Sequence, residues 1–473
     1  MIGLKLNISK KNNFLFFNFK KYRDSRAIIT EKKTFYYKDL DEISDKFLLK
    51  LKNEKKLVFL LGENNYETII GYIGFFKKGY VIAIIDNKIH KSLLNNLIKN
   101  YKPHYIFCQK SSEKIKSYKS IYNFYSYQLL ERTKNLDIKV NENLFLLMST
   151  SGSTGSPKLV RLSYQNVFSN TVSISKYLKI KKKDITITSL PFSYVYGLSV
   201  INTHLHNGST IVLTNKTMTE KKFWGLIDQY KVTNLAGVPY HYLLIERFFK
   251  SFVPKSIKYT TQAGGKMNNI LIKNLLTIYK KHNIKLIQMY GATEATSRMS
   301  YLNHKFAQKK IGSIGQAIPG GKFEIRNKDG KIINTVRKKG ELIYRGKNVF
   351  MGYATCINDL ALSDINKGIL YTGDIAYKDK DDFYYIIGRK DRYVKIYGIR
   401  VNLSELENIL YKKGIDTNMK ELKDNKIEVY FKKLNNIDNI ISYLCKKTNL
   451  KKNVFITKKL TKKNFNKNLK IKI

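Results

Sequence analysis

Short apolar runs alternate with amphipathic stretches in the N-terminal part of the chain. The run 57–61 (LVFLL) predicts a buried strand, and 66–77 carries apolar side chains at helical spacing. The same order returns as a strand over 79–86, a helix over 91–101 and a strand over 105–108. Because strands separated by helices form parallel βαβ units, this pattern predicts an α/β fold.

The pattern repeats in the middle of the chain, where 185–188 and 210–213 predict strands and 223–230 predicts a helix. Beyond Gly312 the texture changes to short strands and turns, and the segment 327–330 (NKDG) predicts a hairpin turn. A compact, lysine-rich tail follows. The 473 residues suffice for two or three domains with a sizeable core. A large α/β body with a β-rich part, followed by a small C-terminal domain, is the simplest division.

The composition makes the chain strongly basic, but the distribution of the basic residues does not indicate a polyanionic partner. The chain has 87 Lys and Arg against 36 Asp and Glu, a net charge of +51. The lysines are spread along the chain together with abundant Asn, Ile, Tyr and Phe, a joint skew typical of AT-rich coding. We therefore expect a solvated basic surface that favours anionic substrates, and no dedicated nucleic-acid binding.

The remaining compositional features favour a cytoplasmic protein. The 3 cysteines stand far apart in no metal-ligand spacing, which argues against a disulfide framework or a zinc site. No targeting segment is visible, and no charge-poor run reaches the ~18 residues that a transmembrane helix needs. We expect neither a signal peptide nor a transmembrane segment.

The most informative stretch is 144–158 (LFLLMSTSGSTGSPK). An apolar strand leads into small hydroxyl residues and glycines, and a helix is expected to begin at Ser163. Such a loop offers backbone N–H groups, hydroxyl donors and one ammonium, the donors that a polyphosphate needs. The spacing is not that of a Walker P-loop, and an ordinary Ser/Gly-rich turn is the alternative. The candidate phosphate-binding residues are Thr150, Ser151, Gly152, Ser153, Thr154, Gly155 and Lys158.

This loop resembles the signature loop of the adenylate-forming superfamily: acyl-CoA synthetases, carrier-protein-loading adenylation domains and luciferases. Further motifs of that family follow in order along nearly the whole chain. They are 288–294 (QMYGATE), 340–342 (GEL), 352–353 (GY), 371–374 (YTGD), 388–391 (GRKD) and 395–401 (KIYGIRV) with Glu405 and Glu407. The resemblance implies an AMP-dependent synthetase and ligase that uses ATP and Mg²⁺.

At the phosphate end, the resemblance assigns roles that suit the chemistry of the residues. Thr293 would donate its hydroxyl to the α-phosphate of ATP, and Glu294 would hold Mg²⁺, a hard cation that prefers oxygen ligands. Lys158 would serve the outer phosphates. Taken alone, the Thr293–Glu294 pair would be a surface pair or a helix cap.

At the nucleoside end, Asp374 would accept hydrogen bonds from both ribose hydroxyls, and Arg389 would offer a planar donor fork to ribose or phosphate oxygens. Tyr290, followed by Gly291, would stack on the adenine. The ordinary alternatives are a turn aspartate, a surface ion pair and a core tyrosine. The resemblance favours the nucleotide roles.

The implied reaction has two steps. A carboxylate attacks the α-phosphate of Mg·ATP to give an acyl adenylate and pyrophosphate, and a thiol of CoA or of phosphopantetheine then takes the acyl group. The resemblance further implies a large adenylation (AMP-binding) domain over 1–390 and a small, shortened, mobile α+β lid over 391–473. The lid would rotate about a hinge near Asp391 between the steps.

The acid is expected to be a small to medium carboxylic acid without an α-amino group. In family members that activate α-amino acids, an aspartate that holds the ammonium stands where this chain has Val195. An ammonium buried against valine would be unpaired and costly. Tyr194 departs from the histidine common in acyl-CoA synthetases and aryl ligases. Gly264 and Gly265 belong to the segment that leaves room beside the acyl chain.

The C-terminal tail departs furthest from the family pattern, which usually ends in P-x-x-x-x-G-K. The counterpart here is 461–467 (TKKNFNK), which makes Lys467 the candidate catalytic lysine. Three alternatives remain at this stage. The enzyme could load the phosphopantetheine of an acidic acyl carrier protein instead of CoA, it could be a degenerate binding subunit, or it could bind nucleic acid through net charge alone.

Overall fold

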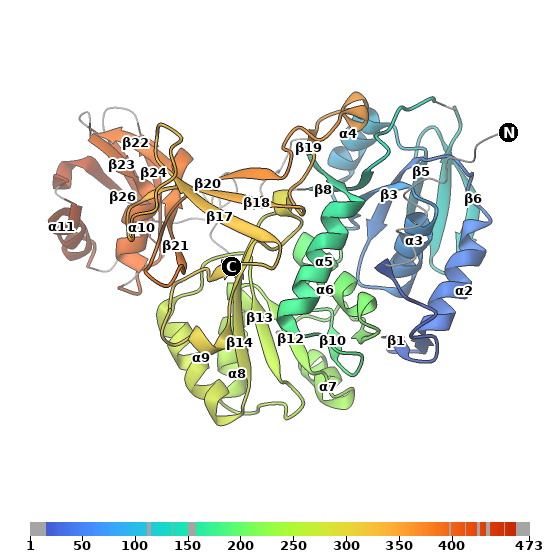
Figure 1. The fold of residues 1–473 in the computed structure, drawn as a ribbon, viewed down its shortest axis with the longest axis horizontal. Coiled ribbons are helices and arrows are strands. Elements are labelled where there is room, and N and C mark those ends of the chain that lie inside the picture. The colour runs from blue at the N-terminus through green and yellow to red at the C-terminus, as the bar shows by residue number, and fades with distance from the viewer. Residues whose placement is uncertain are drawn as a thin grey trace.

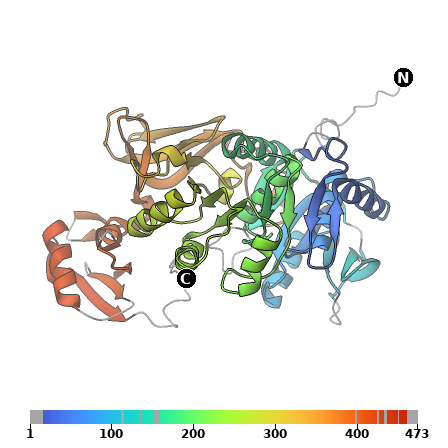
Figure 2. The same cartoon turned by 90° about the horizontal axis from the view of Figure 1, so that it is seen from below.

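The computed structural model describes residues 16–110, 115–134, 136–149, 158–396, 399–411, 413–422, 426–431, 436–448 and 450–459 (Figure 1). The described strands form two large mixed sheets, a four-stranded sheet and two small sheets near the C-terminus. The large sheets stand side by side, and the C-terminal elements form a separate unit at one end of the molecule (Figures 1 and 2).

The first large sheet is built around completely buried strands. Its order, within the described residues, is β19 (Gly352–Ala354), β9 (Leu159–Ser163), β8 (Leu144–Ser149), β4 (Val81–Asp86), β3 (Leu57–Gly62), β5 (Tyr105–Gln109), β7 (Tyr127–Arg132) and β6 (Tyr118–Phe124). Strands β3 and β4 are apolar at nearly every position because both faces are covered. The accompanying helices are α2 (Tyr37–Leu48), α3 (Tyr66–Lys77) and α4 (Lys91–Tyr101).

The second large sheet has a parallel centre. Its order in the described part of the chain is β16 (Gln316–Ala317), β15 (Ser300–Leu302), β14 (Lys285–Tyr290), β13 (Tyr259–Gln262), β12 (Asn234–Gly237), β10 (Ile185–Ile187), β11 (Thr210–Val212), β1 (Arg26–Ile29) and β2 (Thr34–Tyr36). Strands β10 to β14 pair in parallel, and β15 returns antiparallel to β14. Its helices are α7 (Lys221–Gln229), α8 (Pro239–Phe249) and α9 (Asn269–Lys281).

Two helices, α5 (Tyr164–Leu178) and α6 (Val195–His206), lie between the large sheets (Figure 1). The helix that the sequence predicted from Ser163 begins at Tyr164, and Ser163 caps its start with its side chain. The largest hydrophobic cluster contains residues of α5, α6 and both sheets, so the two helices join the sheets into one core.

The β-rich part and the C-terminal unit complete the fold. The four-stranded sheet runs β17 (Gly321–Arg326), β18 (Gly340–Gly346), β20 (Ile369–Lys378) and β21 (Tyr384–Arg389), all antiparallel. The C-terminal unit contains β22 (Tyr393–Ile396), β23 (Ile399–Asn402), α10 (Leu403–Tyr411), β24 (Thr417–Leu422), β25 (Lys426–Phe431), α11 (Ile437–Thr448) and β26 (Phe455–Lys459). It has its own hydrophobic cluster.

The predicted fold class, α/β with a large N-terminal and a small C-terminal domain, is confirmed. The predicted elements lie where the pattern placed them, with shifts at their ends: the strand expected over 79–86 begins at Val81, because Gly79 adopts a φ of +74°. The prediction of parallel βαβ units holds for the centres of both sheets. It misses the antiparallel edge β6–β7, whose tight turn places Tyr125 at a φ of +49°.

Candidate functional site

The structure describes many of the residues that the sequence singled out, and those predicted to bind the nucleotide gather around the ends of β14, β19 and β20. Residues 150–155 of the predicted phosphate loop and Lys467 lie outside the described residues, as does the side chain of Asp391. The described end of the phosphate loop is Lys158, which is exposed directly before β9.

A phenol, a carboxylate and a guanidinium meet where β14 approaches the four-stranded sheet. Tyr290 ends β14 and donates a hydrogen bond to Oδ2 of Asp374 on β20. Arg389, the register partner of Asp374 on β21, donates from Nη1 to Oδ1 at 3.2 Å. The Thr372 hydroxyl oxygen accepts from the Asp374 backbone N–H at 3.0 Å, which fixes the turn that presents the carboxylate. Predicted nucleoside residues from three strands thus form one cluster.

This cluster suits a ribose. Asp374 is 7 % exposed, and a carboxylate of this kind can accept hydrogen bonds from both hydroxyls of a ribose. Burial, strengthened by the Asp374 charge, raises the pKa of Tyr290 well above its usual range. The phenol therefore remains a hydrogen-bond donor to Asp374 at neutral pH.

A second cluster joins Glu294 to Lys158 through Tyr353. Glu294 lies in the single 3-10 turn Thr293–Ala295 after β14, and its Oε1 accepts from the Tyr353 hydroxyl at 2.8 Å. The Nζ of Lys158 lies over the Tyr353 ring, 3.5 Å from its centroid. Burial first, and the Glu294 charge second, raise the pKa of Tyr353. Since β19 pairs with β9, the sheet register holds Lys158 beside this tyrosine.

The second cluster fits Mg²⁺ bound together with a polyphosphate. Among the described residues, no group of three or more His, Cys, Asp or Glu could form a metal cage. Mg²⁺ is commonly held by one or two carboxylates plus substrate phosphates and water, and Glu294 is such a carboxylate on a partly exposed turn. Thr293 beside it is 8 % exposed, so its hydroxyl is held at the same turn.

The loop after β14 is held in place by close backbone packing. A Cβ at Gly291 would lie 1.7 Å from the carbonyl oxygen of Ser297, so only glycine fits there. Asn348 donates from its side chain to the carbonyls of Ala295 at 2.8 Å and Arg298 at 3.0 Å, and Thr296 donates its hydroxyl to the Asn348 carbonyl at 2.7 Å. The structure thus explains why position 291 must be glycine, which the motif alone did not.

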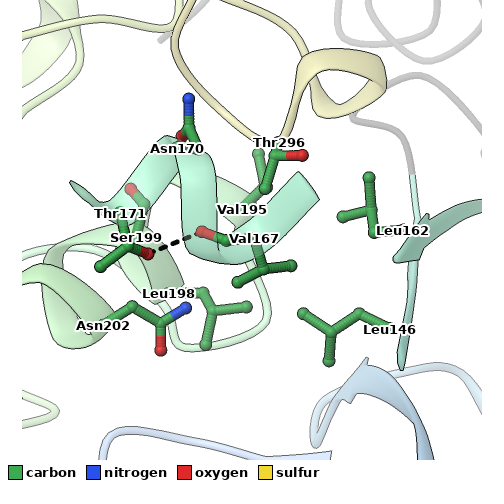
Figure 3. A pocket seen from close by; sticks show the side chains of 10 residues that line it. All are labelled: Leu146, Leu162, Val167, Asn170, Thr171, Val195, Leu198, Ser199, Asn202 and Thr296. Atoms are coloured by element: carbon green, nitrogen blue, oxygen red, sulfur yellow. Dashed lines mark hydrogen bonds between the residues drawn. The ribbon is translucent and has the colours of Figure 1, made fainter. Parts of the chain in front are cut away.

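The predicted acid-pocket residues lie at the start of α6 and beyond β13. Tyr194 precedes the first turn of α6, and Val195, 7 % exposed, lines a cavity of ≈ 10 Å³ between α5, α6 and β8 (Figure 3). Such a volume holds about one water molecule. Gly264 has a φ of +79°, and the carbonyl of Gly265 accepts from Gln262 Nε2 at 2.7 Å. These glycines form a tight turn at the carboxyl end of β13.

Two residues of the site were not assigned roles from the sequence. Tyr353 belongs to a recognised Gly-Tyr motif, but its contact with Glu294 crosses from another sheet strand. Arg298 follows Glu294 by four residues and is 1 % exposed. An arginine in a loop of small residues was the available signal for it.

Comparison with known proteins identifies the class. A sequence profile described as "AMP-binding enzyme" matches residues 15–354. The chain therefore belongs to the AMP-binding enzyme family, which confirms the resemblance and the predicted enzyme class.

Particular relatives and structures narrow the comparison. The chain is 26 % identical over 396 residues to the 2-succinylbenzoate–CoA ligase of Bacillus pumilus, covering 81 % of this chain and 79 % of that one. It is 25 % identical over 388 residues to the ligase of the same name from Listeria innocua, covering 79 % and 76 %. The Bacillus subtilis O-succinylbenzoate coenzyme A synthetase (MenE) with ATP and magnesium ion has a similar fold, with a TM-score of 0.74, 21 % identity and coverage of 94 % and 95 %.

In the described part of the chain, no helix combines the length and apolar character needed to cross a bilayer.

Proposed function

We propose that this protein is an ATP- and Mg²⁺-dependent acid–CoA ligase that activates a non-amino carboxylic acid as an acyl adenylate. The observation that carries the proposal is the convergence of Asp374, Tyr290 and Arg389 with Glu294, Tyr353 and Lys158 around the end of one strand. The 2-succinylbenzoate–CoA ligases among its relatives make 2-succinylbenzoate the first acid to test.

In this proposal each cluster has its own task in the first step. Asp374 and Arg389 hold the ribose, with Tyr290 beside the base. Glu294 would hold Mg²⁺, and Thr293 and Lys158 would donate to the phosphates, together with the loop 150–155. These donors oppose the repulsion between the incoming carboxylate and the polyphosphate, because preorganised cations and hydroxyls act where negative charge develops.

The acid would lie between α6 and the turn after β13, close to Tyr194, Val195, Gly264 and Gly265. Val195 supplies no partner for an ammonium, so α-amino acids should be poor substrates. Leaving a buried charge unpaired should disfavour them by about 10²-fold or more relative to des-amino acids of the same size.

The domain boundary is proposed at residues 390/391, with Asp391 as the hinge. Lys390 donates to Glu341 of β18 at 2.7 Å, so it is tied to the four-stranded sheet. Arg392 donates to Glu407 of α10 at 2.7 Å and to the Met419 carbonyl at 2.6 Å, so it is tied to the C-terminal unit. The chain changes its attachment across a single residue. Residues 391–473, including Lys467 as the catalytic lysine of adenylation, would form the lid, and the enzyme would act in the cytoplasm.

Pyrophosphate release tests the function. The full chain with ATP and Mg²⁺ should release pyrophosphate in response to 2-succinylbenzoate or another non-amino acid of a broad panel, and should form a thioester once CoA is added. Glu294→Gln should slow release across a magnesium titration while the protein stays folded. Thioester formation on a carrier-protein phosphopantetheine but not on CoA would show that the acceptor is a carrier protein and not CoA. No pyrophosphate release with any acid would refute the proposal.

A further inference from the structure

Arg298 is a buried cation without an acidic partner among the described residues. Its side chain is 1 % exposed. Nη1 donates to the hydroxyl oxygens of Ser199 and Ser297, and neither neighbour carries a charge. No described carboxylate forms an ion pair with it. Burying a charge without a counter-charge is costly, so the fold carries a cost here that a bound anion would offset.

Arg161 shows what a purely structural buried arginine looks like in this molecule. It is 0 % exposed, and its Nη1 and Nη2 donate to the carbonyls of Leu362, Met351 and Ser363. Its guanidinium ties three backbone groups together. Arg298, in contrast, bridges only two hydroxyl groups through one nitrogen.

The side of the Arg298 guanidinium formed by Nε and Nη2 lacks acceptors, and this is the side through which arginine binds carboxylates in a bidentate way. Nε of Arg298 is buried without a hydrogen-bond partner, as is Nε of Arg161. The two arginines differ at the terminal nitrogens: both are engaged in Arg161, whereas the described residues engage only Nη1 of Arg298. Nε and Nη2 point their N–H groups in the same direction, and this parallel pair matches the two oxygens of a carboxylate. The nitrogen that is already engaged, Nη1, is on the other side of the guanidinium.

The guanidinium is fixed in one plane. It stacks on the ring of Tyr196, with Cζ 4.0 Å from the ring centroid. The Tyr196 hydroxyl lies 2.7 Å from the Thr261 carbonyl and 2.9 Å from its hydroxyl, which anchors the ring to β13. Asn170 and Asn348 hold the Arg298 carbonyl at 2.9 and 3.0 Å. A donor fork held this firmly is preorganised for a planar anion.

Its surroundings are those of the acid pocket. Tyr196 and Ser199 stand on the first turns of α6, beside Tyr194 and Val195, and Ser199 and Thr296 line the cavity drawn in Figure 3. The Arg298 charge acts on Tyr194 as well, where it opposes the rise in pKa that burial causes. The nucleoside cluster, in contrast, is built on Asp374 and Arg389 of the four-stranded sheet.

We propose that Arg298 binds a second carboxylate on the acid, so that the substrates of this enzyme are dicarboxylic acids of which one carboxylate is activated. This inference rests on the proposed function and deepens it. The reacting carboxylate would lie toward Thr293, and the other would pair side-on with Nε and Nη2 of Arg298. Arg298 is thus a specificity-determining residue, and 2-succinylbenzoate, a dicarboxylate, has the required chemistry.

The test compares acids that differ by one carboxylate. The pairs are 2-succinylbenzoate with 4-oxo-4-phenylbutanoate, and pentanedioate with pentanoate, each measured by pyrophosphate release from the full-length enzyme. The wild type should prefer the dicarboxylate of at least one pair by about 10²-fold or more in kcat/KM. Equal use of both members of every pair would overturn the inference and leave the ligase function intact. No release with any acid would refute the ligase function itself.

Variants separate recognition from folding. Arg298→Gln should lower kcat/KM for the preferred dicarboxylate by about 10²-fold, chiefly through KM, because the contact is made equally before and during the reaction. Its use of the monocarboxylate and its KM for ATP should stay within about threefold. Arg298→Lys should restore part of the loss, since it keeps the charge without the fork. Lys309→Gln removes an exposed cation and should change neither acid.

An equal loss for both acids in Arg298→Gln, with no recovery in Arg298→Lys, would assign Arg298 a structural role and overturn the inference. If Arg298→Gln does not fold, the wild-type comparison and Arg298→Lys decide the question. In that case, a wild-type preference that Arg298→Lys leaves unchanged would also contradict carboxylate binding by the fork.

Discussion

The carboxylates of the site are held by phenols. Asp374 accepts from Tyr290, and Glu294 accepts from Tyr353. A phenol whose pKa is raised by burial stays protonated and keeps donating, so each carboxylate is oriented before nucleotide arrives. Such orientation lowers the cost of assembling the metal and the ribose in the site.

Tyr353→Phe tests this arrangement at the metal. The variant keeps the ring beneath Lys158 but loses the hydroxyl that orients Glu294. Loss of one hydrogen bond to a charged group should raise the apparent requirement for Mg²⁺ and the KM for ATP by about 3- to 30-fold, with little change in thermal stability. Magnesium titrations of pyrophosphate release measure it. Tyr385→Phe is the control, since Tyr385 bonds Asp379 away from the site. Identical titrations for Tyr353→Phe and the wild type would rule out the orienting role.

His204 gives the molecule a predictable pH dependence. It is buried in α6, its Nδ1 lies 2.8 Å from the Val200 carbonyl, and its Nε2 lies 3.1 Å from Asn234 Nδ2. The carbonyl needs a donor and the amide needs an acceptor, so the neutral ring satisfies both. Burial lowers the pKa of His204 to about 4.

The unfolded chain therefore binds a proton on this histidine that the folded chain does not, from its ordinary pKa down to about 4. Stability from this group is fully present above the unfolded pKa and is lost as the pH falls below it, by about 2 kcal/mol at about pH 5. His204→Gln should be less stable at about pH 7.5 but should lose less melting temperature on going to about pH 5. His282→Gln, at an exposed histidine, is the control. Parallel losses in wild type and His204→Gln would contradict the assignment.

The roles of individual site residues could be predicted from the sequence only where those residues belong to a short, contiguous motif. Thr293, Glu294, Asp374 and Arg389 came from short strings, and the last two are also register partners on neighbouring strands. Arg298 was missed because its hydrogen-bond partner Ser199 is 99 positions away, and its stacking partner Tyr196 stands on the same distant helix, α6. Long-range partners are a property of the packed chain and leave no local pattern.

At the scale of elements, strand β9 connects the core to the cluster of Glu294, Tyr353 and Lys158. Arg161 on β9 donates to the carbonyl of Met351, directly before β19, and to the carbonyls of Leu362 and Ser363, further along the chain after β19. Strand β19 carries Tyr353. The pattern of apolar runs predicted the buried strands well, because full burial leaves a continuous apolar stretch. It missed the β6–β7 hairpin, whose β6 strand is largely exposed and polar. It also could not predict that β9 returns antiparallel beside β8.

Arg161→Met should show the value of this connection. Three carbonyls would lose their donor, which should destabilise the protein by about 2–4 kcal/mol and shift β19. Because Tyr353 would move with β19, the KM for ATP should rise as well. Thermal melting and ATP titrations measure the two effects together. The control is Arg345→Met on β18, which removes a partly exposed ion-pair partner of Glu324. It should lower the stability less than Arg161→Met does. A stable Arg161→Met enzyme with unchanged KM would show that β19 is fixed by other contacts.

On the scale of the whole molecule, the residues on either side of residue 391 make their polar side-chain contacts with different parts of the protein. Lys390 is bonded to Glu341 of the β-rich part, and Arg392 to Glu407 of the C-terminal unit. Burial raises the pKa of Glu407, while Arg392 opposes that rise. The pair anchors the start of the C-terminal unit, so rotation about the backbone of residue 391 would move the unit without breaking either contact.

Asp391→Pro tests that rotation. Proline fixes φ near −65°, so it should hold the C-terminal unit in a single orientation. If the unit adenylates in one orientation and transfers to CoA in another, the variant should retain one half-reaction and lose the other by about 10²-fold or more. Acyl-adenylate formation is measured by pyrophosphate release, and transfer by thioester formation from a supplied acyl adenylate. Lys467→Ala provides the complement: it should slow adenylation by about 10²- to 10³-fold and spare transfer. If Asp391→Pro slows both half-reactions equally while the protein melts like the wild type, then residue 391 is not a hinge.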